Sequence, residues 1–248
     1  MNVKVETCFF DNIVFILGAG ESLEEKAAEK IKTEVEKKLA SYQDQETIIL
    51  ELFSFTEVLK GLFELIEKHK NGSVTFYINI SSSTKVVSQA AYMAAALSDA
   101  NIRLYYIKAE EYLSTQLLKF LQNKEDSDIK QFIKGLTEKE AVYLSKGATK
   151  IVEIPVLKMK RPSKSDFEIL EILKAEGGEI SSTAKLIRIM KKLGSKESIQ
   201  ITDRNRYSKR LKYLINQGFV TQDPQGVSKK LSLTDSGAAI AKIGDILK

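Results

Sequence analysis

An apolar segment that runs directly into a cluster of hydroxyl side chains constrains the fold of this 248-residue chain more than any other stretch. Residues 74–80 are mostly apolar, and the run has the length of a β-strand. Because polar residues do not alternate regularly with apolar ones, the run is typical of a strand buried on both faces of a parallel sheet. An Ala-rich helix is predicted to follow over residues 84–98. A buried strand that leads into a helix predicts an α/β sheet.

The residues between this strand and its helix have the chemistry of an anion-binding site. They are Ser81, Ser82, Ser83, Thr84 and Lys85, which supply four hydroxyls, one ammonium and no negative charge. The start of a helix offers unpaired N–H groups and a partial positive charge, which favour phosphate. Open α/β sheets bind ligands where strands end and helices begin. Helix capping is a simpler explanation, but it requires only one of the four hydroxyls.

The heptapeptide Asn79-Ile80-Ser81-Ser82-Ser83-Thr84-Lys85 resembles the ligand motif of CARF domains. The family pattern runs Asn, apolar, Ser/Thr, small, Gly or small, Ser/Thr, Lys/Arg, and Ser83 stands where glycine is usual. CARF domains are Rossmann-like sensors of cyclic oligoadenylates in proteins linked to CRISPR defence. The resemblance covers about the first two thirds of the chain and implies an effector site for a cyclic oligoadenylate. Its ligand-binding residues would be Asn79, Ser81, Ser82, Ser83, Thr84 and Lys85.

Strands and helices are predicted to alternate over those first two thirds. Predicted strands cover residues 13–17, 47–53, 74–80, 102–107 and 150–157, and predicted helices cover residues 23–40, 56–69, 84–98, 110–122 and 129–144. This alternation predicts a mostly parallel sheet between two helical layers. Only residues 1–10 precede what looks like the second strand of a CARF domain. We therefore expect either a short first strand over residues 3–10 or an incomplete opening unit.

A glycine-containing turn at Gly18-Ala19-Gly20 invites comparison with the dinucleotide-binding fingerprint. The third glycine of that fingerprint is absent, because Leu23 occupies its place. No acidic residue stands convincingly at the end of the next strand, where one would bind a ribose. The turn is therefore interpreted as an entry into a helix and not as a dinucleotide site.

The helix after the motif is apolar nearly all round, so it should be buried on several sides. Packing within one chain explains this pattern. A twofold interface is a further explanation, because a cyclic ligand is naturally held between two identical motifs. We expect a homodimer formed through the N-terminal domain.

Composition excludes several classes of protein. The single cysteine, Cys8, allows no intramolecular disulfide, and together with the single histidine, His69, it allows no His/Cys metal cluster. No apolar run approaches the length of a membrane span, and no secretory signal opens the chain. We expect a cytoplasmic protein with no metal and no cofactor other than its effector.

Charge divides the chain into two parts. Residues 155–248 contain 19 Lys and Arg residues against 10 Asp and Glu residues, a net charge of +9, whereas the whole chain carries +5. A basic region beside a mildly acidic one is typical of a nucleic-acid-binding appendage. A basic, proline-containing segment at residues 158–165 predicts a hinge. The expected domains are residues 1–158 and 165–248, joined by a linker over residues 159–164.

The C-terminal region has the element order of a winged helix-turn-helix domain. A capping box of Ser165 and Glu168 predicts one helix, residues 181–183 cap a second, and Thr202 or Asp203 caps a third. Residues 219–222 and 229–233 predict a hairpin with a type I turn at residues 223–226, and Thr234 caps a last helix. This order of elements and the stretch Leu233-Thr234-Asp235-Ser236-Gly237 near the end of the chain resemble winged-helix transcription factors.

In such factors the third helix enters the major groove and the wing follows the backbone. Arginine and asparagine side chains read guanine and adenine edges, whereas lysines hold phosphates. The expected DNA contacts are Ser182, Thr183, Arg204, Asn205, Arg206, Lys209, Arg210, Lys229 and Lys230. A winged helix used only for protein contacts is the alternative.

The layout of the whole chain resembles the CARF–winged-helix regulators associated with archaeal CRISPR systems. The resemblance implies a transcriptional regulator that binds double-stranded DNA and senses a cyclic oligoadenylate, with cyclic tetra-adenylate as the expected ring. The alternative is an enzyme, a CARF ring nuclease in which the 2′-hydroxyl of the ligand attacks the adjacent phosphate and the winged helix is an accessory module. No catalytic residue is assigned, because no histidine or pair of acidic residues lies near the motif. A third possibility is a winged helix that serves only in assembly.

Overall fold

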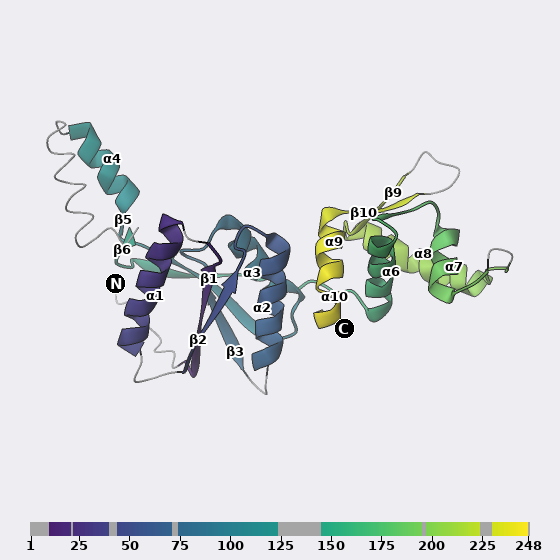
Figure 1. Cartoon of the computed structure of the whole chain (residues 1–248), viewed down its shortest axis with the longest axis horizontal. Coiled ribbons are helices and arrows are strands. Elements are labelled where there is room, and N and C mark those ends of the chain that lie inside the picture. The colour runs from purple at the N-terminus through teal and green to yellow at the C-terminus, as the bar shows by residue number, and fades with distance from the viewer. Residues whose placement is uncertain are drawn as a thin grey trace. The chain divides into compact units, whose positions relative to one another are not determined.

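The computed structural model of the chain describes residues 10–20, 22–39, 44–70, 74–123, 145–194, 197–223 and 230–247. Strands and helices alternate through its N-terminal part (Figure 1). The elements are β1 (Asn12–Gly18), α1 (Leu23–Leu39), β2 (Asp44–Leu50), α2 (Phe55–His69), β3 (Thr75–Asn79), α3 (Lys85–Leu97) and β4 (Asn101–Lys108). They agree with the predicted alternation to within a few residues, so the expected α/β class is confirmed, with a parallel pair between β1 and β2.

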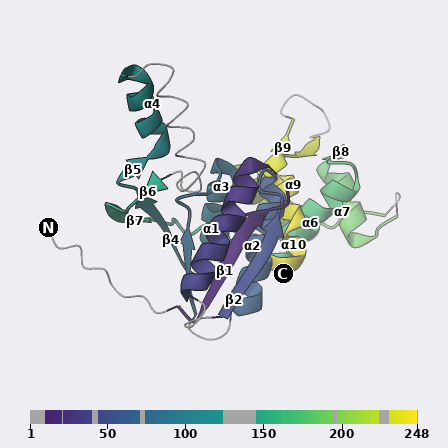
Figure 2. The same ribbon diagram turned by 60° about the vertical axis from the view of Figure 1, so that its left-hand side comes forward.

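Two sheets carry this part of the fold. In the first, β1 pairs in parallel with β2, from Asn12 opposite Asp44 to Gly18 opposite Leu50, and Figure 2 shows the two strands side by side. In the second, the strand order is β3-β4-β7, and β7 (Lys150–Ile154) is antiparallel to β4. The N-terminal part thus contains a parallel pair in one sheet and an antiparallel pair in the other.

Strand β3 is less buried than its apolar sequence predicts. It lies at the end of its sheet order, and none of its five residues is fully buried. Tyr77 is 38% exposed. Its ring packs edge-on against Phe10 at a centroid distance of 5.6 Å, and the guanidinium of Arg103 lies 5.9 Å from its centroid. The prediction of a strand buried on both faces is therefore wrong within the described residues, because Tyr77 and Asn79, which share one face of the strand, are exposed.

Helix α3 is buried as its composition predicts. The buried side chains occupy most of its circumference: Val87, Ala90, Ala91, Ala94, Ala95, Ala96 and Leu97. All of this burial occurs within a single copy of the chain. The apolar composition of α3 is thus explained without a partner, and the homodimer stays a prediction that needs its own test.

The segment after β4 begins with a strand where a helix was predicted. Residues of β5 (Glu111–Tyr112) pair with those of β6 (Ser145–Lys146), so helix α4 starts only at Leu113 and runs over Leu113–Asn123. The predicted helix over residues 129–144 lies outside the described residues, as does most of the expected opening strand over residues 3–10. No helix in the described ranges is long and apolar enough to cross a membrane.

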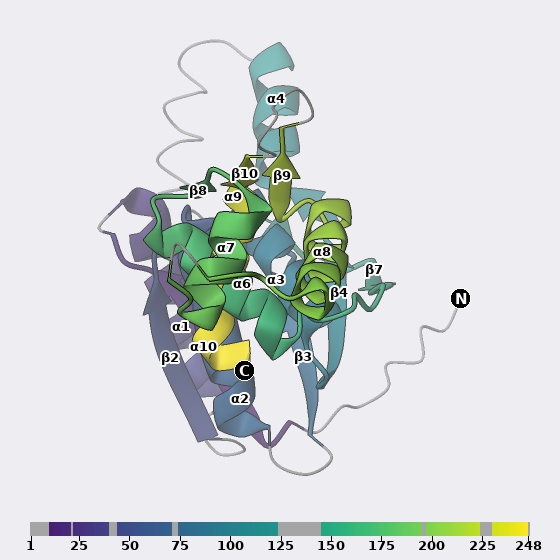
Figure 3. The same cartoon turned by 90° about the vertical axis from the view of Figure 1, so that its right-hand side faces the viewer.

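The chain divides into two compact units. The first comprises Met1–Glu57, Tyr77–Ser88 and Arg103–Pro155, and the second comprises Val58–Phe76, Gln89–Ile102 and Val156–Lys248. Figure 3 labels the C-terminal elements, and all of them belong to the second unit. They are α6 (Lys164–Ala175), β8 (Glu179–Ile180), α7 (Thr183–Lys191), α8 (Ile201–Asn216), β9 (Val220–Gln222), β10 (Leu231–Leu233), α9 (Asp235–Lys242) and α10 (Gly244–Leu247). The three strands form an antiparallel sheet in the order β8-β10-β9.

One apolar core holds these C-terminal helices together. Its fully buried members come from α6, α7, α8 and the start of the hairpin: Phe167, Leu170, Leu173, Leu186, Leu214 and Leu231. Helical spacing places these side chains on one face of each helix, and the polar residues on the opposite faces stay exposed.

The starts of two helices differ from the predicted ones. Helix α6 begins at Lys164 because Ser163, and not Ser165, forms a capping box with Asp166. Helix α8 begins at Ile201 after Gln200, earlier than Thr202 or Asp203 would allow. The caps at Ser182 and Thr234 are confirmed. The predicted turn at residues 223–226 lies outside the described residues except for Asp223.

Candidate ligand and nucleic-acid sites

The turn between β3 and α3 is fixed by its own hydroxyls. Asn79 Oδ1 accepts hydrogen bonds from Ser81 N at 3.0 Å and from Ser81 Oγ at 2.5 Å. Ser81 Oγ in turn accepts from Ile107 N at 2.6 Å, which attaches the turn to β4. Asn79 and Ser81 therefore hold the backbone of the turn, and Asn79 Oδ1 and Ser81 Oγ are engaged before any ligand arrives.

Ser83 and Thr84 also have structural partners. Ser83 Oγ donates to Ile80 O at 2.9 Å and lies 2.7 Å from Ser88 Oγ. Thr84 Oγ1 accepts from Val87 N at 3.1 Å, as the side chain of an N-cap residue does. The capping explanation therefore holds for one hydroxyl, Thr84, and Ser83 braces the first turn of α3 from the side.

Ser82 and Lys85 remain as the donors of the motif that no protein group occupies. Both side chains are exposed, and neither has a hydrogen-bond or ion-pair partner among the described residues. Lys85 is the first residue of α3, where the helix dipole is positive. One hydroxyl, one ammonium and the first amides of a helix form a compact set of donors for a phosphate oxygen.

The loop after β2 lies against the motif, which the sequence did not reveal. Thr84 Oγ1 donates to Leu52 O at 3.4 Å. The next residue, Phe53, is 76% exposed, and its N–H is bonded to Glu51 Oε1 at 3.3 Å. An exposed aromatic ring one residue from a contact with the motif is a surface on which a nucleic-acid base can stack. An aromatic residue at the end of the strand predicted over residues 47–53 was the available signal.

The turn after β1 holds an anion of its own. The carboxylate of Glu25 accepts from Gly20 N at 3.0 Å and from Ser22 N at 2.8 Å. These hydrogen bonds, that from Ser22 above all, hold the pKa of Glu25 below its ordinary value. A Cβ atom at Gly18 or Gly20 would have to displace this carboxylate from its present position. The amides that a dinucleotide phosphate would need are thus engaged by the chain itself, in agreement with the rejection of that fingerprint.

Helix α8 presents several of the predicted DNA contacts to solvent. Arg204, Asn205, Arg206 and Lys209 are exposed. Among the described residues, Arg204, Asn205 and Lys209 have no polar partner, whereas the guanidinium of Arg206 lies 5.9 Å from the ring centroid of its neighbour Tyr207. These side chains are available to an approaching duplex.

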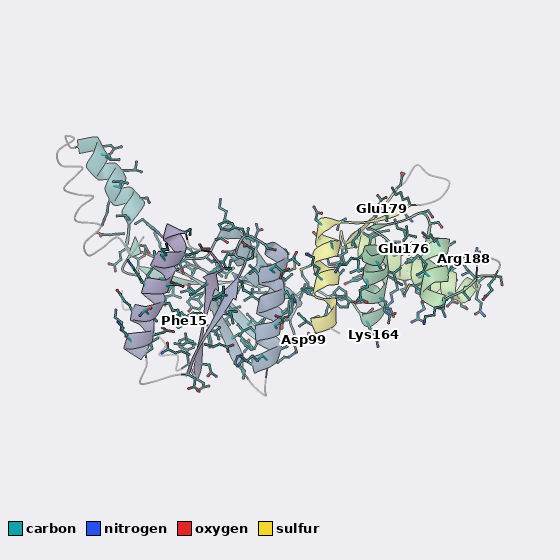
Figure 4. The ribbon with its side chains drawn as sticks, viewed as in Figure 1. Phe15, Asp99, Lys164, Glu176, Glu179 and Arg188 are labelled. Carbon is teal, nitrogen blue, oxygen red and sulfur yellow. The ribbon has the colours of Figure 1, made fainter. Side chains whose placement is uncertain are left out.

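Two predicted DNA contacts are instead engaged with carboxylates of the protein. Arg210 NH1 donates to Asp166 Oδ2 at 3.1 Å, and Lys230 Nζ lies 2.6 Å from Glu179 Oε2. The hydrogen bond from Lys230 holds the pKa of Glu179 below its ordinary value. Glu179 is labelled in Figure 4. Helical spacing alone did not identify either partner, because both lie far away in the sequence. Lys229 lies outside the described residues.

The remaining predicted contacts lie at the start of α7. Ser182 Oγ accepts from Lys185 N at 3.2 Å, so it caps the helix, and Thr183 is its first residue. Two residues of α8 that the sequence analysis did not select also face solvent. Lys212 is exposed, and Ile201 is 77% exposed. With Asn205 they follow helical spacing, so one stripe of α8 carries apolar, amide and cationic groups together.

Comparisons with known proteins give related chains without an assigned activity. The family model described as "HFX_2341_N:-like, N-terminal" matches residues 6–112, which include the motif and less than half of the chain. An uncharacterized protein of Archaeoglobus fulgidus is 23% identical over 212 residues, 86% of this chain and 79% of the relative.

Two solved structures are similar at a low level. Enterococcus italicus Csm6 bound to cyclic hexa-2′-fluoro-hexa-dAMP gives a TM-score of 0.33 at 12% identity, over 85% of this chain and 48% of the other. Can2 from Sulfobacillus thermosulfidooxidans in complex with cyclic tetra-adenylate gives a TM-score of 0.30 at 8% identity, over 96% of this chain and 63% of the other. The chain thus spans about half and just under two thirds of these proteins. At such TM-scores the assignment of a ligand depends on the residues of the motif.

Proposed function

We propose that the protein is a DNA-binding regulator whose affinity for DNA is controlled by a cyclic oligoadenylate. The observation that carries the proposal is that some residues of the motif hold the turn while others are exposed. Asn79, Ser81, Ser83 and Thr84 are engaged in holding the turn, and Ser82 Oγ and Lys85 Nζ are exposed at the first turn of α3. A preformed turn with two free donors is what a phosphodiester group requires, since little ordering remains to be done on binding.

The phosphate and the base of the ligand each have a counterpart in the protein where the strands end. The phosphate would accept a charge-assisted hydrogen bond from Lys85 and a second bond from Ser82. An adenine base would stack on the exposed ring of Phe53. A ring of four adenylates repeats this unit, so two copies of the motif would bind it across a twofold axis.

The dimer is tested on the full chain. Light scattering of the ligand-free protein or of its complex with cyclic tetra-adenylate should give about twice the mass of one chain, 27.8 kDa. A monomer in the presence of saturating ligand would contradict the shared site.

The second unit supplies the expected DNA-binding element. Three helices, a hairpin and a closing helix follow in the order of a winged helix-turn-helix, which supports the assignment of α8 as the recognition helix. Its exposed groups Arg204, Asn205, Lys209 and Lys212 are donors suited to base edges and phosphates. The charge of +9 over residues 155–248 favours DNA over a purely protein partner.

A ring nuclease is the second candidate, and the free ammonium of Lys85 is the observation that favours it. In that reaction a 2′-hydroxyl of the ring attacks the adjacent phosphorus, the bond to the 5′-oxygen breaks, and a 2′,3′-cyclic phosphate and a 5′-hydroxyl result. Lys85 would stabilise the charge that develops on the phosphate.

One experiment tests the proposal and separates it from the enzyme. The full chain is incubated with radiolabelled cyclic tetra-adenylate, and bound and cleaved ligand are measured from the same sample by filter retention and chromatography. The proposal predicts retained, intact ring in the wild type and reduced retention in Lys85→Met. Linear product that accumulates in excess over protein would favour the nuclease. No retention and no product would overturn both.

A further inference from the structure

The segment between the two expected domains is held at its beginning by the end of α3. Lys158 Nζ donates to three backbone carbonyl oxygens, those of Ala95 at 3.0 Å, Ser98 at 2.9 Å and Ala100 at 3.2 Å. Carbonyls at the end of a helix lack partners within it and carry a partial negative charge. Lys158 therefore caps α3 with a full positive charge, in contacts that a solvated linker residue would not make.

Two neighbours of Lys158 make further contacts with the same region. Met159 N donates to Ala96 O at 2.9 Å. Arg161 NH1 lies 3.6 Å from Asp99 Oδ2, and Asp99, just beyond α3, is labelled in Figure 4. Three of four successive residues thus contact residues at the end of α3.

The same short segment is also held by α8. Tyr213 OH donates to Lys160 O at 2.9 Å, and Lys160 Nζ lies 5.7 Å from the centroid of the Tyr213 ring. Burial, and after it the charge of Asp166, raises the pKa of the Tyr213 hydroxyl. Arg210 NH1 donates to Ser163 Oγ at 2.6 Å. These contacts alternate along the chain with those made to α3.

We propose that residues 157–163, here named the strap, are a rigid coupling element between the ligand motif and the recognition helix. Lys158, Tyr213 and Arg210 are its positioning residues. The inference rests on the proposed function, since it concerns how ligand binding reaches the DNA-binding surface. It replaces the hinge that the basic sequence predicts, because the charges of Lys158, Lys160 and Arg161 are engaged by the protein.

The path is short and continuous. Helix α3 begins with Lys85 of the motif and ends where Lys158 is bound, and its 13 residues span about 20 Å at 1.5 Å per residue. A ligand that draws the N-terminus of α3 toward itself would shift the carbonyls that hold Lys158. The strap would then move Tyr213 and Arg210, and with them α8. Coupling of this kind requires that the strap makes defined contacts with both helices, and it is hydrogen-bonded to the end of α3 and to α8.

The test measures coupling and not affinity alone. The dissociation constant for a selected DNA duplex is measured with and without saturating cyclic tetra-adenylate, in wild type, Lys158→Met and Tyr213→Phe. Met keeps most of the Lys158 stem and removes its ammonium. The matched control is Lys60→Met, on the surface of α2, where Lys60 makes only an exposed ion pair with Glu64.

The expected result is that the ratio of the two constants falls to about 1 in Lys158→Met and is reduced in Tyr213→Phe, while the dissociation constant measured without the ring stays within about threefold of wild type. Lys60→Met should keep the wild-type ratio. A merely structural role would lower affinity or stability and leave the ratio unchanged, and that result would overturn the strap.

A second measurement needs no ligand and keeps failure of the strap distinct from failure of the proposed function. Amide hydrogen exchange is followed for peptides that cover residues 157–163 in the ligand-free protein. The strap predicts protection of the Met159 amide, which donates to Ala96, and faster exchange in Lys158→Met. Exchange at the rate of an open chain in wild type would overturn the strap whether or not the protein binds the ring. Protection together with absent ring binding would refute the proposed function alone.

Discussion

The guanidinium of Arg210 on α8 donates to the carboxylate of Asp166 on α6 over 3.1 Å, and Asp166 is only 2% exposed. The same carboxylate oxygen accepts from Ser163 N at 2.8 Å and from Ser163 Oγ at 2.6 Å. One acceptor therefore caps α6, receives the cation of α8 and orients the last residue of the strap. Arg210, which helical spacing predicts as a DNA contact, has a structural role in this arrangement.

Removing this cation should destabilise the protein. Arg210→Met leaves the buried carboxylate of Asp166 without its charge partner, for which a loss of about 1–3 kcal/mol of unfolding free energy is expected, because the Arg210 side chain is partly exposed and Ser163 still donates to Asp166. Urea denaturation measures the loss. The matched control is Lys209→Met, whose exposed side chain has no partner among the described residues and should change stability by less than about 0.5 kcal/mol. Equal losses of unfolding free energy in Arg210→Met and Lys209→Met would show that the Arg210–Asp166 ion pair does not stabilise the protein.

Substitutions of neighbouring residues in the motif should have two distinct effects, one on ligand binding and one on stability. Lys85→Met should weaken binding of cyclic tetra-adenylate by about 1.5–3 kcal/mol and leave stability unchanged, because the Lys85 ammonium has no hydrogen-bond or ion-pair partner in the part of the chain that the structure describes. Ser81→Ala should lower the unfolding free energy by about 1 kcal/mol, because the hydrogen bond to Ile107 N is lost. Calorimetric titration and urea denaturation of both variants check the two effects. A Lys85 variant that binds as well as wild type would move the ligand elsewhere.

The ring of Phe53 should report on the ligand directly. The chain has no tryptophan, so Phe53→Trp introduces a single tryptophan beside the motif, whose emission can be excited selectively over that of the tyrosines. Stacking of an adenine should quench its emission on addition of cyclic tetra-adenylate, and Phe53→Ala should cost about 1–3 kcal/mol of binding. Leu118→Trp is the control, since Leu118 is also exposed, at 61%, but lies on α4, outside the motif and the strap. Equal quenching at both positions would argue against stacking at Phe53.

The exposed stripe of α8 predicts two kinds of effect on DNA binding. Asn205→Ala should relax base preference at one position of the selected site and cost about 1–3 kcal/mol. Lys212→Ala should weaken binding to all sequences alike and lower the slope of the salt dependence by about one unit, because it would hold a phosphate. Site selection followed by salt titration distinguishes these outcomes. If Asn205→Ala and wild type bound every DNA sequence with the same affinity, α8 would not be the helix that contacts the bases.

The pattern of neighbouring residues in the sequence was sufficient to predict most of the helices and strands. The alternation of β1 to β4 with α1 to α3, and the caps at Ser182 and Thr234, depend on neighbouring residues, which is the information that a sequence displays. The start of α6 was misplaced because two serines compete for the cap, and the carboxylate of Asp166 selects Ser163.

The candidate sites were predicted in part, since the partners of their side chains are distant in sequence. Ser81 was selected as a ligand donor, but its hydroxyl is bound by the backbone of Ile107, 26 residues away. Lys230 was selected for phosphate, but Glu179 receives it. Helical spacing identifies which side chains face outward, and it cannot identify a distant residue that meets them there.

The central claim is that a ring bound at the motif changes the affinity of the protein for DNA. The most direct measurement is the dissociation constant for a selected duplex with and without saturating cyclic tetra-adenylate, in wild type and Lys85→Met. The account predicts about a 5- to 150-fold difference in wild type, the usual range of allosteric coupling, and a smaller difference in Lys85→Met at equal ring concentration. Equal dissociation constants in wild type, with the ring shown to be bound and intact, would contradict it.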